Sequence, residues 1–311
     1  MTAVQKKATR ASFGEALVQL GADYPQVVVL DADLSKSTKS EGFSKKYPNR
    51  FFQMGIQEAN MIGVAAGMSF SGKVPFLCSF GAFLSGRFDT IRVTVGYAQA
   101  NVRLIGTHAG VGIGEDGCSQ MALEDLACMR VLPGMLVLQP ADDIETHAMM
   151  EYLCRHQGPA YVRLSRQDLP RVHSENYRFE PGKAHTIKEG SDTVVFATGA
   201  LVGSALEASK ELSTKGLNVG VVNVSSIKPI DRASIEKYAS QFKTIFTAED
   251  HSVIGGLGAA VSEVTSGLGL ACKVVRIGVN DVYGESGTPE DLYRFHKLDG
   301  VGVAHTIQSY F

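Results

Sequence analysis

VVVLDADL, residues 27–34, combines a short apolar run with two aspartates at its end. This pattern is typical of a parallel strand that is buried on both faces and has a polar tip. The same strand-then-polar-loop pattern recurs in VPFLCSF (74–80), NVRLIGTHAG (101–110), GMLVLQPAD (134–142) and PAYVRLSR (159–166). Segments with helical character separate these strands. The sequence therefore predicts βαβ units and an α/β fold with a mostly parallel sheet flanked by helices.

The helical segments have their own signals. Apolar residues at helical spacing predict a helix from Thr9 to Leu20, opened by a threonine cap. FFQMGIQEANMIGVAAGMSFSG, residues 51–72, predicts a strand end, a polar turn and a helix. In this interpretation Glu58 lies in the turn, between the strand and the helix.

The chain divides into two predicted domains. Residues 167–190 are polar and contain Pro170 and Pro181, so we interpret them as a linker that could pair briefly as a hairpin. Strand and helix signals restart at DTVVFATGALVG, and further strands follow in NVGVVNV, TIFTAED and CKVVRIGV. The predicted organisation is a first α/β domain over residues 1–166, the linker, and a smaller α/β domain over residues 191–311.

Composition excludes several classes of protein. A formal net charge of −2 and a pI near 6.5 give no electrostatic reason to expect nucleic acid or an anionic membrane as partner. The five cysteines are scattered without a CxxC pair, which favours a reduced, intracellular protein. The N-terminal segment lacks the apolar stretch of a secretory signal, and no window reaches 18 uninterrupted apolar residues. We therefore expect a cytoplasmic protein.

The polar strand tips are the places to search for a site, because ligands of parallel sheets collect beyond the carboxyl ends of the strands. These tips come from separate strands but should lie on one edge of one sheet. They are Asp31–Asp33, Gln57–Glu58, Ser79–Phe80, Thr107–His108 and Ser165–Arg166.

Three groups at these tips could do chemistry. Burial beside apolar neighbours would raise the pKa of Glu58, although a glutamate favoured by the dipole at a helix start is an equal alternative. His108, together with Arg10, Ser37 and Arg166, could bind a phosphate or sulfonate; a structural histidine is the alternative. Phe80 and Phe83 could stack on a flat heterocycle or belong to the core.

The loop GVGIGEDG, residues 110–117, superficially resembles a dinucleotide fingerprint. Such a motif needs its glycines in the first βα turn, and here Glu115 and Asp116 would repel a pyrophosphate. One histidine and two carboxylates on a flexible loop are also weak support for a metal site. We expect neither a nucleotide nor a metal ligand set here.

Taken together, these segments resemble transketolase. GIQEANMIGVAAGM (55–68), SFGAF (79–83), THAGVGIGEDG (107–117) and RLSRQDLP (163–170) resemble its pyrimidine-binding domain in order and spacing. EDHSVIGGLGAAVSE (249–263) and YGESGTPEDL (283–292) resemble the C-terminal domain that transketolases share with deoxyxylulose-phosphate synthases and 2-oxoacid dehydrogenase β subunits. The resemblance implies transfer of a two-carbon ketol unit with thiamine diphosphate and Mg²⁺ as cofactors.

The resemblance also assigns roles to individual residues. Glu58 would protonate the aminopyrimidine ring of thiamine diphosphate, Phe80 and Phe83 would form the aromatic wall of its pocket, and we add Asp33 to the cofactor-binding set. Asp116 would meet a substrate hydroxyl. The residues that correspond to the family's ligands for the substrate phosphate are Arg10, Ser37, His108 and Arg166.

Two positions depart from the family pattern. Gln120 stands where a histidine usually reaches the donor substrate, and an amide cannot carry that charge or shuttle a proton efficiently. Gly86 stands where the family has a tyrosine in the pocket wall. These departures put the usual sugar-phosphate specificity in doubt and keep open an inactive, regulatory transketolase-like chain. The other alternative is a β subunit of a 2-oxoacid dehydrogenase-type complex.

The family's domain that holds the diphosphate and Mg²⁺, with its GDG motif, has no counterpart in this sequence. The resemblance therefore implies the C-terminal subunit of a split transketolase, active only with a separate N-terminal subunit. The ligands for Mg²⁺ would lie on that partner. Since the family builds its sites at subunit interfaces, we expect a heterotetramer with two equivalent sites.

Overall fold

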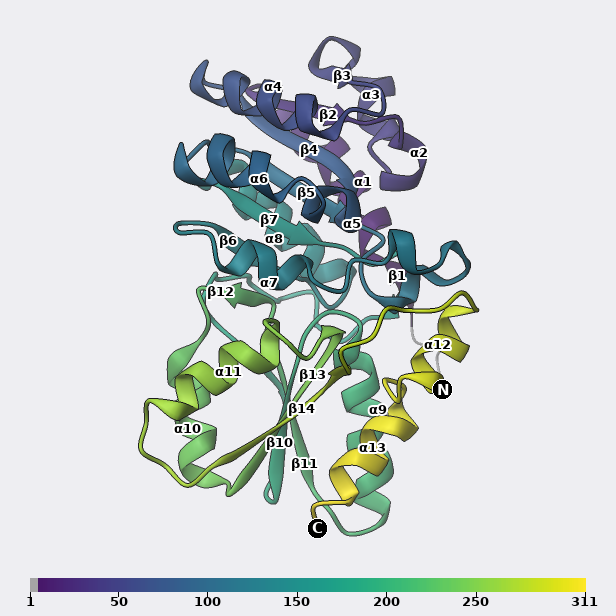
Figure 1. Ribbon diagram of the computed structural model, residues 1–311, viewed down its shortest axis with the longest axis vertical. Coiled ribbons are helices and arrows are strands. Elements are labelled where there is room, and N and C mark those ends of the chain that lie inside the picture. Colours follow the sequence, from purple (N-terminus) through teal and green to yellow (C-terminus); the bar gives the residue numbers. More distant parts are fainter. Residues whose placement is uncertain (1–4) are drawn as a thin grey trace.

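The computed structural model describes residues 5–311 and shows two α/β lobes, stacked along the long axis in Figure 1. The first half of the chain forms the upper lobe around a seven-stranded sheet with the order β12-β6-β7-β5-β4-β2-β3. This sheet is parallel except for β12. Its strands are β2 (Val27–Asp31), β3 (Phe51–Gln53), β4 (Val74–Phe80), β5 (Arg103–Thr107), β6 (Leu136–Leu138), β7 (Ala160–Arg163) and β12 (Ser226–Lys228).

Helices cover both faces of this sheet. Alternate residues of β2 point to opposite faces, as the pleat of a strand requires. Val28 and Leu30 pack in the cluster that contains α4 residues, whereas Val27 and Val29 pack in the cluster that contains residues of α1 and α8. The helices of the lobe are α1 (Thr9–Asp23), α2 (Ser35–Thr38), α3 (Glu41–Lys46), α4 (Glu58–Phe70), α5 (Gly81–Ser85), α6 (Phe88–Thr90), α7 (Asp125–Arg130) and α8 (Asp143–Arg155). Shorter helical segments are η1 (Pro48–Arg50), η2 (Ile91–Tyr97), η3 (Val111–Asp116) and η4 (Cys118–Gln120).

The lower lobe is built around a five-stranded sheet with the order β14-β13-β10-β11-β9, parallel except for β9. The four strands predicted for this half are present as β10, β11, β13 and β14. The elements are β9 (His185–Lys188), β10 (Thr193–Ala197), α9 (Leu201–Thr214), β11 (Val219–Asn223), α10 (Arg232–Gln241), β13 (Thr244–Ser252), α11 (Leu257–Ser266), β14 (Lys273–Val279), α12 (Pro289–Phe295) and α13 (Gly300–Gln308). The α/β prediction for both halves is confirmed.

The segment 167–190 does not form the hairpin that the sequence suggested. Its first strand, β8 (Asp168–Pro170), pairs with β1 (Lys6–Ala8) near the N-terminus. Its second strand, β9, adds to the edge of the lower sheet by pairing with β11. β1 and β8 form a separate two-stranded sheet, in which each satisfies backbone N–H and C=O groups of the other, whereas β9 covers the edge strand β11.

One strand crosses between the lobes. β12 follows β11 of the lower lobe, yet it pairs with β6 and extends the upper sheet. The sheet of one lobe thus includes backbone from the other, which ties the two lobes together. Among residues 5–311, no helix combines the length and the apolar composition that a membrane span requires.

Candidate functional site

The predicted strand tips lie on one edge of the upper sheet. The register pairs Asp31 with Cys78, Phe80 with Thr107, and Gly106 with Arg163, so the carboxyl ends of β2, β4, β5 and β7 lie close together. This clustering confirms the sequence-based inference for four of the five tips. The fifth needs a correction, because Glu58 does not end a strand: β3 stops at Gln53.

Glu58 is the first residue of α4, so the helix-start alternative describes its place in the backbone. Its side chain still reaches the carboxyl end of β4. The residue is only 6% exposed, and its Oε1 accepts a hydrogen bond from the Ser79 hydroxyl at the end of β4 (3.2 Å). Glu58 is therefore both a residue at a helix start and a buried carboxyl group at the edge of the sheet, so the two alternatives do not exclude each other.

The aromatic residues form one stack beside this carboxyl group. The rings of Phe80 and Phe83 lie 5.2 Å apart at 13°, and the Phe80 ring lies 3.9 Å from the His108 ring. Phe80 is buried in a hydrophobic cluster with Phe83 packed against it. Ser79 and Phe80 are consecutive, so the carboxyl end of β4 carries both the contact with Glu58 and the first ring of the stack.

Backbone pairing brings Arg10 and Arg166 together from the two ends of the upper lobe. The β1–β8 ladder aligns the residues before Arg10 with those after Arg166. The Thr9 hydroxyl lies 2.9 Å from the Ser165 hydroxyl and accepts from the Ser165 N–H (2.8 Å). The predicted threonine cap of α1 is thus wrong, because no side-chain cap bond is made and Thr9 bonds across the sheet edge instead.

His108 lies between these cations in a left-handed backbone conformation (φ 59°). A guanidinium group only donates, so His108 Nε2 accepts from Arg10 (3.0 Å), and Nδ1–H donates to the Thr107 hydroxyl (2.8 Å). Burial, followed by the positive charges of Arg10, Arg166 and Lys39, lowers the pKa of His108 to about 3. The imidazole is therefore a neutral group held among positive charges.

The loop after β2 supplies the other side of this cluster. The Ser37 carbonyl oxygen accepts from Arg10 (2.7 Å), so Ser37 meets the cluster through its backbone. Asp33 is exposed at φ 66°, and its N–H donates to the Gln53 side chain (2.6 Å). The neighbouring Asp31 is fully buried and accepts from the Thr38 hydroxyl (2.8 Å), which holds the loop in place.

Arg166 also contacts the loop that follows β5. Its guanidinium donates to the carbonyl oxygen of Ile113 and to Glu115 (3.4 Å), and it lies 3.9 Å from an Asp116 carboxylate oxygen. Gln120 is half-buried at the end of η4, where its N–H donates to the Gly117 carbonyl oxygen (3.2 Å). Among the described residues, no hydrogen bond links the Gln120 side chain to the cluster.

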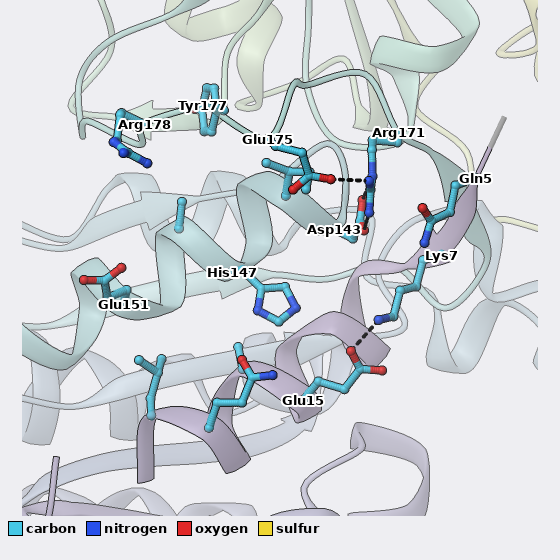
Figure 2. A pocket seen from close by; sticks show the side chains of 15 residues that line it. Gln5, Lys7, Glu15, Asp143, His147, Glu151, Arg171, Glu175, Tyr177 and Arg178 are labelled. Carbon is cyan, nitrogen blue, oxygen red and sulfur yellow. Dashed lines mark hydrogen bonds and ion pairs between the residues drawn. The ribbon is translucent and has the colours of Figure 1, made fainter. Parts of the chain in front are cut away.

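A separate cleft of about 560 Å³ opens between α1, α8 and the segment after β8 (Figure 2). Its walls carry charges of both signs that largely neutralise each other. Lys7 pairs with Glu15, and Arg171 pairs with Asp143 and with Glu175 (2.7 Å). The candidate residues lie at the carboxyl ends of the strands and do not line this cleft.

Sequence reasoning missed Lys39, and it named Asp31 only as part of a strand tip without the role in the loop that the structure shows. Lys39 adds a third cation near His108, and Asp31 orders the loop that carries Ser37. The three serines and two lysines of LSKSTKS, residues 34–40, were the available signal. Gln167 and the residues of the lower lobe that contact the loop 110–117 had no local signal, because they meet the loop only after the two lobes pack.

Comparison with known proteins identifies the class of this chain. The family model for the transketolase pyrimidine-binding domain matches residues 5–172, and the model for the transketolase C-terminal domain matches residues 182–303. The two lobes therefore define a two-domain α/β protein built from the pyrimidine-binding and C-terminal domains of transketolase. The chain belongs to the transketolase family.

Three relatives extend this assignment. The chain is 43% identical over 304 residues to a putative transketolase C-terminal section of Methanocaldococcus jannaschii, covering 97% of this chain and 95% of that protein. It is 40% identical over 286 residues to a 6-deoxy-6-sulfo-D-fructose transketolase subunit of Clostridium sp., covering 91% and 88% of the two chains. A solved split-gene transketolase, described as an inactive β4 tetramer, superposes with a TM-score of 0.90 at 47% identity and 97% coverage of each chain.

Proposed function

We propose that this chain is the C-terminal subunit of a thiamine-diphosphate-dependent transketolase that moves a two-carbon ketol unit from an anionic ketose to an aldose. The observation that carries the proposal is the convergence of Arg10 and Arg166 on neutral His108, beside the aromatic stack and buried Glu58. Burial, followed by the charge of Arg166, lowers the pKa of Arg10, so the two cations act on each other. An anion between them would relieve that repulsion.

The pocket fits the anionic end of a substrate. Arg10 uses one nitrogen for Ser37 and His108, while its buried Nε has no hydrogen-bond partner among residues 5–311. A phosphate or sulfonate oxygen is the acceptor that such a donor lacks. The 6-deoxy-6-sulfo-D-fructose transketolase subunit among the relatives supports a phosphorylated or sulfonated ketose as the substrate class.

The second part of the pocket fits the aminopyrimidine ring of thiamine diphosphate. The stacked rings of Phe80 and Phe83 offer an aromatic wall, and Glu58 offers a buried carboxyl group whose proton could bond a ring nitrogen. Bound thiamine diphosphate would supply the electron sink for cleavage of the carbon–carbon bond. This chain would hold the ring, keep a proton at Glu58 and clamp the anionic substrate. Asp116, 3.9 Å from Arg166, would face a substrate hydroxyl, and Asp33 would border the cofactor.

Activity would require a separate N-terminal subunit that holds the diphosphate and Mg²⁺, with two copies of each subunit in a heterotetramer. The β4 tetramer of the split-gene relative, described as inactive, supports this requirement. An assembly of one subunit type would lack part of each site.

The test mixes the full chain with the candidate N-terminal subunit, thiamine diphosphate, Mg²⁺, a phosphorylated or sulfonated ketose and an aldehyde acceptor. We expect two-carbon transfer by the pair and none by either subunit alone. Glu58→Ala should lower turnover at least about 100-fold, the usual lower bound for a positioned acid or base. The proposal fails if the assembled pair transfers no two-carbon unit from any such ketose.

A further inference from the structure

The glycines of the loop 110–117 lie against the lower lobe and the segment that leads to it. A Cβ atom on Gly110 would come within 2.2 Å of an Asp250 carboxylate oxygen, and Asp250 is on β13 of the lower lobe. A Cβ atom on Gly112 would come within 2.2 Å of the Gln167 amide. Gly110 also has φ 76°, a conformation that side chains strain.

The next two glycines of the loop make the same kind of contact with the chain around α12, shown in yellow at the border between the lobes (Figure 1). A Cβ atom on Gly114 would meet Pro289 at 3.1 Å, and one on Gly117 would meet the Ser286 hydroxyl at 2.5 Å. Both glycines have φ 81°. The glycine spacing that resembled a dinucleotide motif therefore allows close packing between lobes.

A chain of hydrogen bonds runs beneath this contact. The Gln167 amide donates to the Tyr293 hydroxyl (2.8 Å), and Tyr293 donates to Asp250 (3.0 Å). Asp250 is bonded in turn by the guanidinium of Arg163, which also donates to the Ala122 carbonyl oxygen (2.9 Å). The chain thus links Gln167 to α12, to β13 and to the Ala122 carbonyl oxygen, which also accepts from the N–H of Gly110 at the start of the loop (3.0 Å).

The first member of this chain is the direct neighbour of the substrate-binding arginine. Gln167 follows Arg166, and its amide fills the space above Gly112. Arg166 in turn donates to the carbonyl oxygen of Ile113, the residue after Gly112. A shift of the Gln167 amide would therefore move the loop and the arginine together.

We infer that Gln167, Tyr293 and Asp250 are positioning residues, through which the C-terminal domain sets the places of Arg166 and of the loop that carries Asp116. The three residues are linked by hydrogen bonds, and Asp250 and Gln167 lie against Gly110 and Gly112. They act through Arg166 without touching the substrate. The inference rests on the proposed function where it treats Arg166 and Asp116 as substrate-binding residues.

The test replaces Tyr293 by Phe, which removes the hydroxyl and keeps the ring. In the full chain, amide hydrogen exchange over residues 110–120 should become about 3- to 10-fold faster, the equivalent of one net hydrogen bond. The dissociation constant for inorganic phosphate, measured by calorimetry, should rise by a similar factor. Tyr238→Phe is the matched control, since Tyr238 is also buried in the lower lobe and its hydroxyl lies 3.0 Å from the Thr186 hydroxyl.

A purely structural role predicts a different pattern. It would give Tyr293→Phe and Tyr238→Phe equal effects on thermal stability and leave exchange in the loop unchanged. That result, in folded Tyr293→Phe protein, would overturn the inference. If Tyr293→Phe does not fold, Gln167→Met tests the same link and must give the same acceleration.

The two proposals fail in distinguishable ways. If the unaltered chain binds no phosphate, the anion site of the proposed function is wrong, and the exchange measurement still decides the positioning role. In the assembled pair, Tyr293→Phe should raise the KM for the anionic ketose about 3- to 10-fold with a smaller change in kcat. An unchanged KM beside faster loop exchange would contradict the link to Arg166.

Discussion

Two clusters of charge, only a few residues apart in sequence, differ in how their polar groups are satisfied. Around Arg163 every partner is internal: it bonds Asp125 (3.0 Å), Asp250 and the Ala122 carbonyl oxygen, with its side chain 1% exposed. Burial acts to lower the pKa of Arg163, but the two carboxylates outweigh it and the pKa lies above its ordinary value.

The cluster around His108 has the opposite character. Cations from three segments surround a neutral imidazole, and the buried Nε of Arg10 is left without a partner within the described chain. A buried donor without an acceptor is costly and calls for an explanation. The difference teaches that the satisfied cluster joins residues of both lobes, whereas the unsatisfied one leaves a buried donor free for the anionic ligand that we propose.

The largest expected effect breaks the satisfied cluster. Arg163→Met leaves the carboxylates of Asp125 and Asp250 buried without their cation, so the free energy of unfolding should fall by about 3–5 kcal/mol. Urea denaturation measures this change in the free energy of unfolding. The matched control is Arg155→Met, which breaks an exposed pair with Glu151 and should cost less than about 1 kcal/mol. Equal losses in the two variants would contradict the distinction.

The next effect is the pH dependence that the unsatisfied cluster imposes. The folded chain holds the His108 pKa at about 3, whereas an unfolded chain has a pKa near 6.5, so the unfolded state binds more protons between these values. Stability from neutral His108 is complete above pH 6.5 and declines as the pH falls toward 3. Between pH 6.5 and 5 the loss should be about 2 kcal/mol.

Denaturation of the His108→Asn variant at pH 7 and pH 5 measures this contribution. The variant should lose less stability on acidification than the unaltered chain, because asparagine does not titrate in this range. Identical losses in both proteins would show that burial and the charges of Arg10 and Arg166 do not lower the pKa of His108 in the folded chain.

A smaller effect concerns ligand binding. Arg166→Ala should raise the KM of the assembled pair for an anionic ketose about tenfold, since a charged hydrogen bond contributes about 1.5–3 kcal/mol and Arg166 is partly exposed. Steady-state kinetics measures it. Arg178→Ala, in the separate cleft of Figure 2, is the control and should leave KM unchanged. If only the control variant raised KM, the anion would bind in that cleft.

The smallest effect is on folding when a site carboxyl is neutralised. Glu58→Gln should change the free energy of unfolding by less than about 1 kcal/mol, because Ser79 is its one hydrogen-bond donor among residues 5–311. Glu249→Gln is the comparison: that carboxylate is fully buried and accepts from the Leu257 and Gly258 N–H groups, so its loss should cost about 1–3 kcal/mol. Thermal unfolding ranks the two, and the reverse order would contradict the assignment of Glu58 to a ligand site.

The sequence alone predicted the strands and the edge where their ends meet. The apolar runs of β2 and β4 are long enough and apolar enough to be buried, and the parallel rule then brings Phe80, Thr107 and Arg166 to one side. It also identified the family through motifs at those same ends. These features are local, or follow from the period of the strand and the handedness of βαβ units.

Other features depended on contacts that no local pattern encodes. Residues 167–190, interpreted as a linker that could pair briefly as a hairpin, instead pair through β8 with β1 and through β9 with β11, because these distant strands offered partners that the segment alone does not contain. The Thr9 hydroxyl likewise does not cap the helix as predicted but contacts the Ser165 hydroxyl. The pairing that joins Arg10 to Arg166 could not be derived from either segment by itself.

The sequence by itself determined which residues stand at the strand ends and which family they belong to, because periodicity and motif spacing are written along the chain. Only the tertiary structure decided why glycines stand in GVGIGEDG. Asp250 packs so close to Gly110, and Gln167 so close to Gly112, that any side chain at these glycines would clash with them. The physical reason is that close packing between two lobes is a property of both surfaces, and each surface is assembled from residues far apart in sequence.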